Sequence, residues 1–107
     1  MTTFNERGDA FEKQFAHDAD LRFKATARRN KLLGLWVAER TGKTGEEADA
    51  YAKSVVLADF EEAGDEDVLR KVRKDLEAAG KPVDESELSR KFGELTARAI
   101  EEIKAGR

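Results

Sequence analysis

The sequence predicts an all-α fold, a compact four-helix bundle with a mobile or extending amphipathic N-terminal arm, and three observations lead to that expectation. Ala, Glu, Lys, Arg and Leu, the strongest helix formers, are abundant among the 107 residues, whereas Pro occurs once. Apolar residues recur at spacings of three and four, which is the period of an amphipathic helix. Short turns that contain Gly divide this pattern into four long segments, and short connections favour packing of neighbouring helices in a bundle.

The first long segment, residues 21–39, is expected to be the central helix. At about 100° per residue, one face carries Leu21, Ala25, Leu32 and Trp36, and a second carries Phe23, Ala27, Gly34 and Val37. A helix that is apolar on two sides is normally packed by more than one neighbour. The single Trp belongs to the first face, so we expect it to nucleate the core.

Three further helices follow, each bounded by residues that typically start or end a helix. The second begins with a capping box at Thr44–Glu47 and ends near Gly64. Asp65 is expected to cap the third helix, which Gly80 closes, and a second capping box at Asp84–Glu87 opens the fourth. The residues predicted to point inward include Tyr51, Ala52, Val55, Val68, Leu69, Val72, Leu76, Leu88, Phe92, Leu95, Ile100 and Ile103.

Residues 1–16 are predicted to form a separate N-terminal arm. A helix this short is marginal in water, and Gly8 disfavours it by about 1 kcal/mol relative to Ala. We expect the arm to become helical against a partner; packing of its apolar face on the bundle is the alternative. The apolar phase slips at residues 16–20, which places the boundary with a bundle of residues 17–107. The apolar face of the arm consists of Phe4, Phe11 and Phe15, at spacings of seven and four.

The net charge of −3 is unevenly distributed along the chain. Residues 1–20 hold five acids and two bases, residues 21–42 hold six bases and one acid, and residues 43–64 hold six acids and two bases. The overall sign disfavours nucleic-acid binding, which usually needs a strongly basic surface. His17 lies at the junction of arm and bundle, where an ordinary pKa near 6.5 makes it a candidate pH-sensitive group; the alternative is that it has no such role.

The basic residues of the predicted central helix allow two interpretations. They could bind phosphate groups, which would make the chain a nucleotide- or anion-binding regulator. Alternatively, they form salt bridges with the acidic second helix and with the helix end. The candidate anion-binding residues are Arg22, Lys24, Arg28, Arg29 and Lys31, within about 14 Å of helix length.

Motifs for catalysis, cofactors and metals are absent from the sequence. It contains no phosphate-binding loop, dinucleotide fingerprint, zinc-protease motif or serine-hydrolase motif. With no Cys and one His, a thiolate or imidazole metal site is not expected, and the acids of residues 59–67 lack the spacing of a calcium-binding loop. No apolar run approaches the roughly 20 residues that span a bilayer. We therefore expect no enzyme activity, cofactor or membrane insertion, and we expect no signal peptide.

The chain closely resembles the alphaproteobacterial ATP synthase zeta subunit family. The resemblance rests on residues 11–39, FEKQFAHDADLRFKATARRNKLLGLWVAE, and residues 50–80, AYAKSVVLADFEEAGDEDVLRKVRKDLEAAG. It implies a four-helix bundle without catalytic activity that inhibits the F1 motor, and hence a cytoplasmic protein peripheral to the inner membrane through F1.

The resemblance also implies how inhibition works. In this family the N-terminal arm inserts at a catalytic interface between the alpha and beta subunits, near the central stalk formed by gamma, and blocks rotation in the hydrolysis direction. The implied partners are therefore the alpha, beta and gamma subunits of F1. The residues of this chain that the resemblance assigns to partner binding are Phe4, Arg7, Phe11, Glu12, Lys13 and Phe15.

Overall fold

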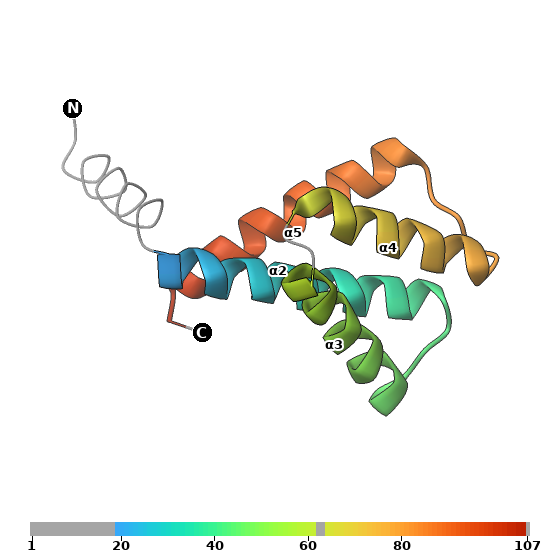
Figure 1. The fold of residues 1–107 in the computed structure, drawn as a ribbon, viewed down its shortest axis with the longest axis horizontal. Helices are drawn as coiled ribbons and strands as arrows, with labels where there is room; N and C mark the ends of the chain where they lie inside the picture. Colours follow the sequence, from blue (N-terminus) through green and yellow to red (C-terminus); the bar gives the residue numbers. More distant parts are fainter. Residues whose placement is uncertain (1–18, 62–63, 107) are drawn as a thin grey trace.

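The computed structural model describes residues 19–61 and 64–106, and these residues form four α-helices and no strand (Figure 1). The predicted all-α four-helix bundle is confirmed. The predicted arm, residues 1–16, lies outside the described residues. The helices are α2 (Ala19–Arg40), α3 (Gly45–Glu61), α4 (Asp65–Ala78) and α5 (Glu85–Lys104).

The long helix α2 is the centre of the fold. It packs against each of the other three helices, as its two apolar faces predict. In Figure 1, α3 crosses α2 obliquely, and α5 returns along α2 so that the start of α2 and the end of α5 lie at the same end of the molecule. This arrangement holds the first turns of α2 close to the last turns of α5.

The core forms where the buried faces of the four helices meet. Its largest fully buried side chains include Leu33, Val37, Val55, Val68, Val72, Leu76 and Leu88. Trp36, which the sequence analysis expects to nucleate the core, packs against this cluster but is only half-buried. The Arg40 guanidinium lies 4.9 Å from the centroid of the Trp36 ring. Leu33, which neither predicted face included, lies at the centre instead.

Gly34 is needed where α2 and α3 meet. A Cβ at this position would lie 2.6 Å from the Ala52 Cα and 3.2 Å from a Val55 methyl group. Gly is a weak helix former, but here its missing side chain lets the two backbones approach closely. This close contact accounts for the one residue that weakens the helical pattern of residues 21–39.

The helix ends agree with the prediction in position but not in capping. Gly42 and Gly80 have positive φ angles of 81° and 74° in the turns after α2 and α4. The N-cap of α4 is Gly64 rather than Asp65, which lies in the first turn and there complements the helix dipole. Asp84 is the N-cap of α5 as predicted, but its side chain makes no capping hydrogen bond. The predicted side-chain caps at these two helices are therefore wrong.

Candidate functional site

The residues predicted to bind a partner through the N-terminal arm lie outside the described part of the chain. They are Phe4, Arg7, Phe11, Glu12, Lys13 and Phe15, and the predicted pH-sensitive His17 lies outside it too. The described site closest to the arm in sequence is the first half of α2, residues 19–31, which we call the arm root. The arm root carries all five of the predicted anion-binding cations.

Three of those five cations form ion pairs with other described residues. Lys24 Nζ lies 3.2 Å from Asp20 Oδ2, one turn earlier in α2. Arg28 Nη1 lies 3.2 Å from Glu102 Oε1 near the end of α5. The third is Arg29, whose partner lies at the start of α4. Salt bridging was one of the two predicted interpretations, but among the described residues none of these partners belongs to the acidic helix α3.

Arg29 is a buried cation with a complete set of neighbours. Its side chain is 6% exposed, its Nε and Nη2 donate hydrogen bonds of 3.1 and 2.9 Å to Asn30 Oδ1, and its Nη1 lies 3.1 Å from Asp65 Oδ1. The guanidinium carbon lies 4.4 Å from the centroid of the Phe92 ring in α5. A buried charge is costly unless it is paired. The contacts of Arg29 with Asp65 and Phe92 provide this pairing and link α2 to α4 and α5. The charge of Arg29 alone does not predict that linkage.

Glu102 fixes the end of α5 to the arm root. Its carboxylate accepts a hydrogen bond of 2.9 Å from Arg98 Nε and one of 3.2 Å from Arg28 Nη1. The bond from Arg98, followed by that from Arg28, lowers the pKa of Glu102 below its ordinary value, although partial burial acts in the opposite direction. The carboxylate is therefore ionised at neutral pH and can hold both guanidinium groups.

Arg22 and Lys31 are the two remaining cations of the arm root. Both are exposed, and neither forms an ion pair with a described residue. Nine residues separate them, so at about 100° and 1.5 Å per residue they lie on opposite sides of α2, roughly 13 Å apart along its axis. The structure therefore does not bring all five predicted anion-binding residues into one site.

A small cleft lies between the arm root and the last turns of α5. It has a volume of about 200 Å³ and is lined by Arg22, Ala25, Thr26, Arg29, Thr96 and Ile100. The Thr96 hydroxyl already donates a 2.8 Å hydrogen bond to the Phe92 carbonyl oxygen. The cleft thus combines an apolar floor with one exposed and one buried guanidinium, and its size suits a single side chain or a small anion.

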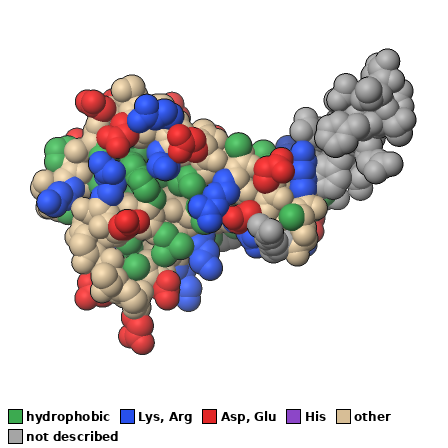
Figure 2. Space-filling model, turned by 180° about the vertical axis from the view of Figure 1, so that it is seen from behind, with side chains coloured by type: hydrophobic (Ala, Val, Ile, Leu, Met, Phe, Trp, Pro, Cys, Tyr) green, Lys and Arg blue, Asp and Glu red, His purple; other side chains and the backbone are tan. Residues whose placement is uncertain are grey.

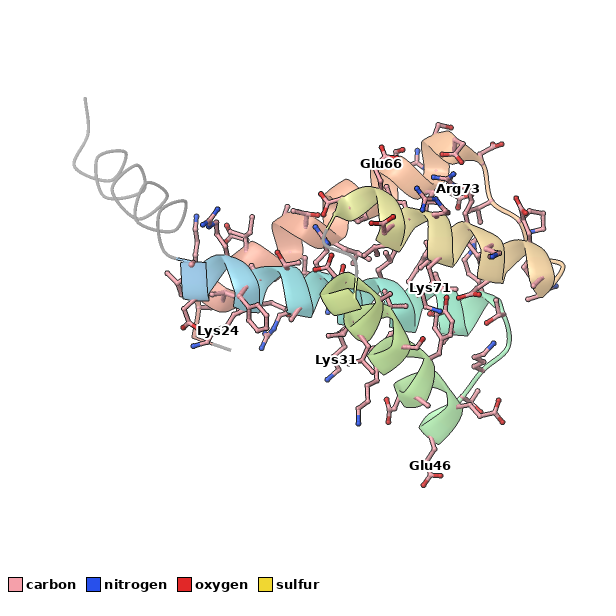
Figure 3. The ribbon with its side chains drawn as sticks, in the orientation of Figure 1. Lys24, Lys31, Glu46, Glu66, Lys71 and Arg73 are labelled. Atoms are coloured by element: carbon pink, nitrogen blue, oxygen red, sulfur yellow. The ribbon has the colours of Figure 1, made fainter. Side chains whose placement is uncertain are left out.

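A second basic surface, which the sequence reading did not single out, lies on α4. The basic residues of the run RKVRK at residues 70–74 line a groove of about 660 Å³ beside α3. Figure 3 labels two of these side chains, Lys71 and Arg73, which project from α4. Lys71 Nζ lies 3.0 Å from Asp75 Oδ2, and Arg73 Nε forms a 2.7 Å ion pair with Glu85 that lacks hydrogen-bond geometry. Counting consecutive basic residues could have found this surface.

Tyr51 connects α3 to this surface of α4. Its hydroxyl donates a 2.7 Å hydrogen bond to Asp75 Oδ2, and the Nζ atoms of Lys43 and Lys71 lie 5.4 and 5.3 Å from its ring centroid. Burial raises the pKa of Tyr51 above its ordinary value, and the bond to Asp75 adds to the effect. On the face seen in Figure 2, Lys and Arg side chains are likewise mixed with Asp and Glu. The groove is therefore a paired surface with no single sign of charge.

Comparison with known proteins decides the family. The sequence model of ATPase inhibitor subunit zeta matches residues 1–102. The chain belongs to the ATPase inhibitor subunit zeta family. A solved structure, described as a solution NMR structure, is 53% identical to this zeta-family chain with a TM-score of 0.70, and the match covers 81% of this chain and 99% of that one. The comparison with curated proteins gave no match.

The zeta family is one of inhibitor subunits, which regulate an ATPase. In the part of this zeta-family chain that the structure describes, no helix is both long and apolar enough to cross a membrane. Across residues 19–61 and 64–106, no three His, Asp or Glu side chains are grouped so that they could hold a metal ion.

Proposed function

We propose that this chain inhibits ATP hydrolysis by the F1 part of ATP synthase, and that its N-terminal arm inserts at a catalytic interface between an alpha and a beta subunit, near gamma. The observation that carries the proposal is the family match, which begins at residue 1 and therefore includes the arm as well as the bundle. On this proposal the chain regulates another enzyme, has no catalytic activity of its own, and lies at the cytoplasmic side of the inner membrane through F1.

The composition of the arm suits insertion into a cleft. Phe11 and Phe15, one helical turn apart, would bury apolar surface there, while Glu12 and Lys13 would meet charged cleft walls. A segment that orders only when it binds gives up part of its interaction energy as ordering entropy, but it can enter a narrow interface that a folded domain cannot.

The described bundle would carry the arm from outside that interface. The chain after the arm enters α2 at Ala19, and the arm root is held by the pairs of Arg28 with Glu102 and Arg29 with Asp65. Because α2 packs against all three other helices, the position of its first turn is fixed relative to the whole bundle. The arm would therefore start from a rigid base.

The second candidate function is a nucleotide- or anion-binding regulatory bundle. One observation favours it, since Arg22 and Arg29 line the same cleft of about 200 Å³. Arg29 already binds Asn30 and Asp65, so fewer of its N–H donors are left for an anion. Titration with phosphate or ADP, followed by the NMR signals of the two guanidinium groups, tests this candidate; unchanged signals would dispose of it.

The deciding experiment measures ATP hydrolysis by F1 depleted of its own zeta subunit. Full-length protein should inhibit, whereas a chain that starts at His17 should not, although its far-UV circular dichroism should still show a folded helical bundle. Inhibition by both chains would contradict the role of the arm. Inhibition by neither would contradict the proposed function itself.

A further inference from the structure

The cleft between the arm root and α5 lies at the end of the bundle where the chain enters α2. The helix α2 begins at Ala19, and Arg22, which lines the cleft, lies in its first turn. Figure 1 shows the last turns of α5, which supply the other wall, at the same end of the molecule. On the proposed function this end of the bundle lies nearest to F1, because the arm leaves from it. The cleft is therefore placed to contact the partner.

The lining of the cleft is apolar at the floor and has one hydroxyl group to offer. Ala25 is buried and Ile100 is half-buried, and both side chains are purely apolar. The Thr96 hydroxyl already donates a hydrogen bond to a backbone carbonyl oxygen of α5. In the described part of the chain the Thr26 hydroxyl has no hydrogen-bond partner, so it can donate to a bound group. The floor thus suits methylene groups, and Thr26 is left for a polar end.

Arg22 is the charged group with which the cleft can bind a partner. Its side chain is exposed and forms no ion pair with a described residue. Arg29, the other guanidinium of the cleft, already uses all three of its nitrogen atoms to contact Asn30 and Asp65. A guanidinium carries five N–H donors in a planar fork, which matches the two oxygen atoms of a carboxylate. Arg22 can therefore bind a carboxylate through two parallel hydrogen bonds.

The size and the charge of the cleft restrict what it can bind. Its volume of about 200 Å³ is below the range of about 300–1,000 Å³ that is typical of small-molecule pockets, so it suits one side chain better than a whole nucleotide. The arm root holds five bases and one acid, a net charge of +4 on a chain whose net charge is −3. A single acidic side chain meets both limits, because its methylene groups are apolar and its carboxylate is negative.

We propose that this cleft is a docking site for one Asp or Glu side chain of F1. The proposal rests on the proposed function. The carboxylate of F1 accepts two N–H hydrogen bonds from Arg22 and one O–H hydrogen bond from Thr26, while its methylene groups lie against Ala25 and Ile100. Charge-assisted bidentate pairs of this kind are strong, and they fix the orientation of the partner as well as its position. The bundle therefore binds F1 itself and sets the direction from which the arm enters.

The test compares Arg22→Gln with Lys31→Gln in the full-length protein. Each change removes one exposed cation of the arm root, but Lys31 lies on the opposite side of α2 and outside the cleft. Each variant is titrated against ATP hydrolysis by F1 that lacks its own zeta subunit, and its melting temperature is measured by circular dichroism. We expect the half-inhibitory concentration to rise about 5–30-fold for Arg22→Gln and less than about twofold for Lys31→Gln. Both melting temperatures should stay close to that of the wild type, because neither side chain has an ion pair to lose among the described residues.

A cross-linking experiment tests the chemistry of the partner directly. The substitution Arg22→Lys keeps the positive charge and introduces an amine, which a carbodiimide joins without a spacer to a carboxylate in contact with it. The complex of this variant with F1, formed at a saturating concentration, is treated with the carbodiimide, digested and analysed by mass spectrometry. We expect an amide bond between position 22 and an Asp or Glu side chain of F1. Lys31, which lies outside the cleft, is the internal control and should give no such link.

The outcomes separate this inference from the proposed function. A wild type that does not inhibit overturns both. If the wild type inhibits and Arg22→Gln inhibits as strongly as Lys31→Gln, the docking site is wrong while the role of the arm stands. A lower melting temperature for Arg22→Gln alone, or a cross-linked complex in which position 22 carries no F1 peptide, would also overturn the docking site. Phosphate that shifts the NMR signals of the Arg22 guanidinium, without any effect of Arg22→Gln on inhibition, would assign the cleft to a free anion instead.

Discussion

Gly34 and Gly93 provide a matched test of how closely α2 approaches α3. Both lie inside long helices, so Ala at either position raises the helix propensity by about 1 kcal/mol. Their surroundings differ. A Cβ at Gly34 would lie 2.6 Å from the Ala52 Cα, whereas a Cβ at Gly93 would meet no atom within 4 Å. The difference between the two substitutions therefore isolates the packing of α2 on α3.

We expect Gly34→Ala to lower the free energy of unfolding by about 2 kcal/mol. An ordinary contact is at least 3.4 Å, so the helices must separate by about 0.8 Å at this point, and a backbone atom cannot rotate away. Overpacking costs about 1–3 kcal/mol, and the upper end applies because Ala52 and Val55 lose contacts as the helices separate. The gain of about 1 kcal/mol in propensity is then subtracted.

Gly93→Ala should raise the free energy of unfolding by about 1 kcal/mol, because only the propensity term changes. Urea unfolding of the full-length protein, followed by far-UV circular dichroism and by the fluorescence of Trp36, measures both variants by linear extrapolation. The expected gap between them is about 3 kcal/mol. If Gly34→Ala is as stable as the wild type or more so, α2 and α3 do not approach as closely as the structure has them.

Three further predictions concern the core and two titratable groups. Tyr51, the sole tyrosine, should show no phenolate absorbance near pH 10.0 in the folded protein, because burial and the hydrogen bond to Asp75 raise its pKa. The stability that Tyr51 contributes is present below pH 10.0 and is lost as the pH rises through the folded pKa. Ionisation of Tyr51 near pH 10.0 without unfolding would contradict this prediction. Glu102→Gln should lower the urea midpoint at about pH 7, and by progressively less as the pH falls below 4.5, because a depressed pKa stabilises the fold above 4.5 and that contribution is lost as the pH falls through the folded value. A loss of the same size throughout the acid range would contradict this account. Leu33→Ala should cost about 2–5 kcal/mol and Trp36→Ala less, since only Leu33 is fully buried, and the reverse order in urea melts would refute that account of the core.

The helix boundaries follow from local signals, and the sequence predicts them well. The central helix was expected over residues 21–39 and spans 19–40, and the turns after α2 and α4 contain Gly42 and Gly80, as expected. A positive φ angle in a turn depends only on the residue itself, because Gly has no side chain that would disfavour it. The side-chain cap expected at Asp84 is absent because a cap also needs one particular rotamer, which competes with solvation of the carboxylate.

The burial of individual side chains is less predictable, because it depends on residues distant in sequence. Periodicity identifies apolar faces on α2, but how α3 and α5 cross it decides that Leu33 is covered and Trp36 lies at the edge. Periodicity also assigns every Arg to the surface. Arg29 is buried because Asp65 and Phe92, from two other helices, meet its guanidinium.

The candidate site is predictable only in part. The basic character of the arm root is readable from residues 19–31, but the pairing of Arg28 with Glu102 and of Arg29 with Asp65 is not. The role of the arm comes from the family resemblance and stays a prediction, since no periodic pattern specifies a partner. The resemblance itself is confirmed by the match over residues 1–102.

The central position of α2 has a mechanical consequence. Among the described helices, a force transmitted along the backbone from before Ala19 reaches α2 first. Since α2 packs against each of the other helices, such a load is shared at once across three interfaces rather than peeling one helix from the edge. The bundle is therefore built as an anchor. Tension on its N-terminus should meet the resistance of the whole fold, and the protein should give way in one step.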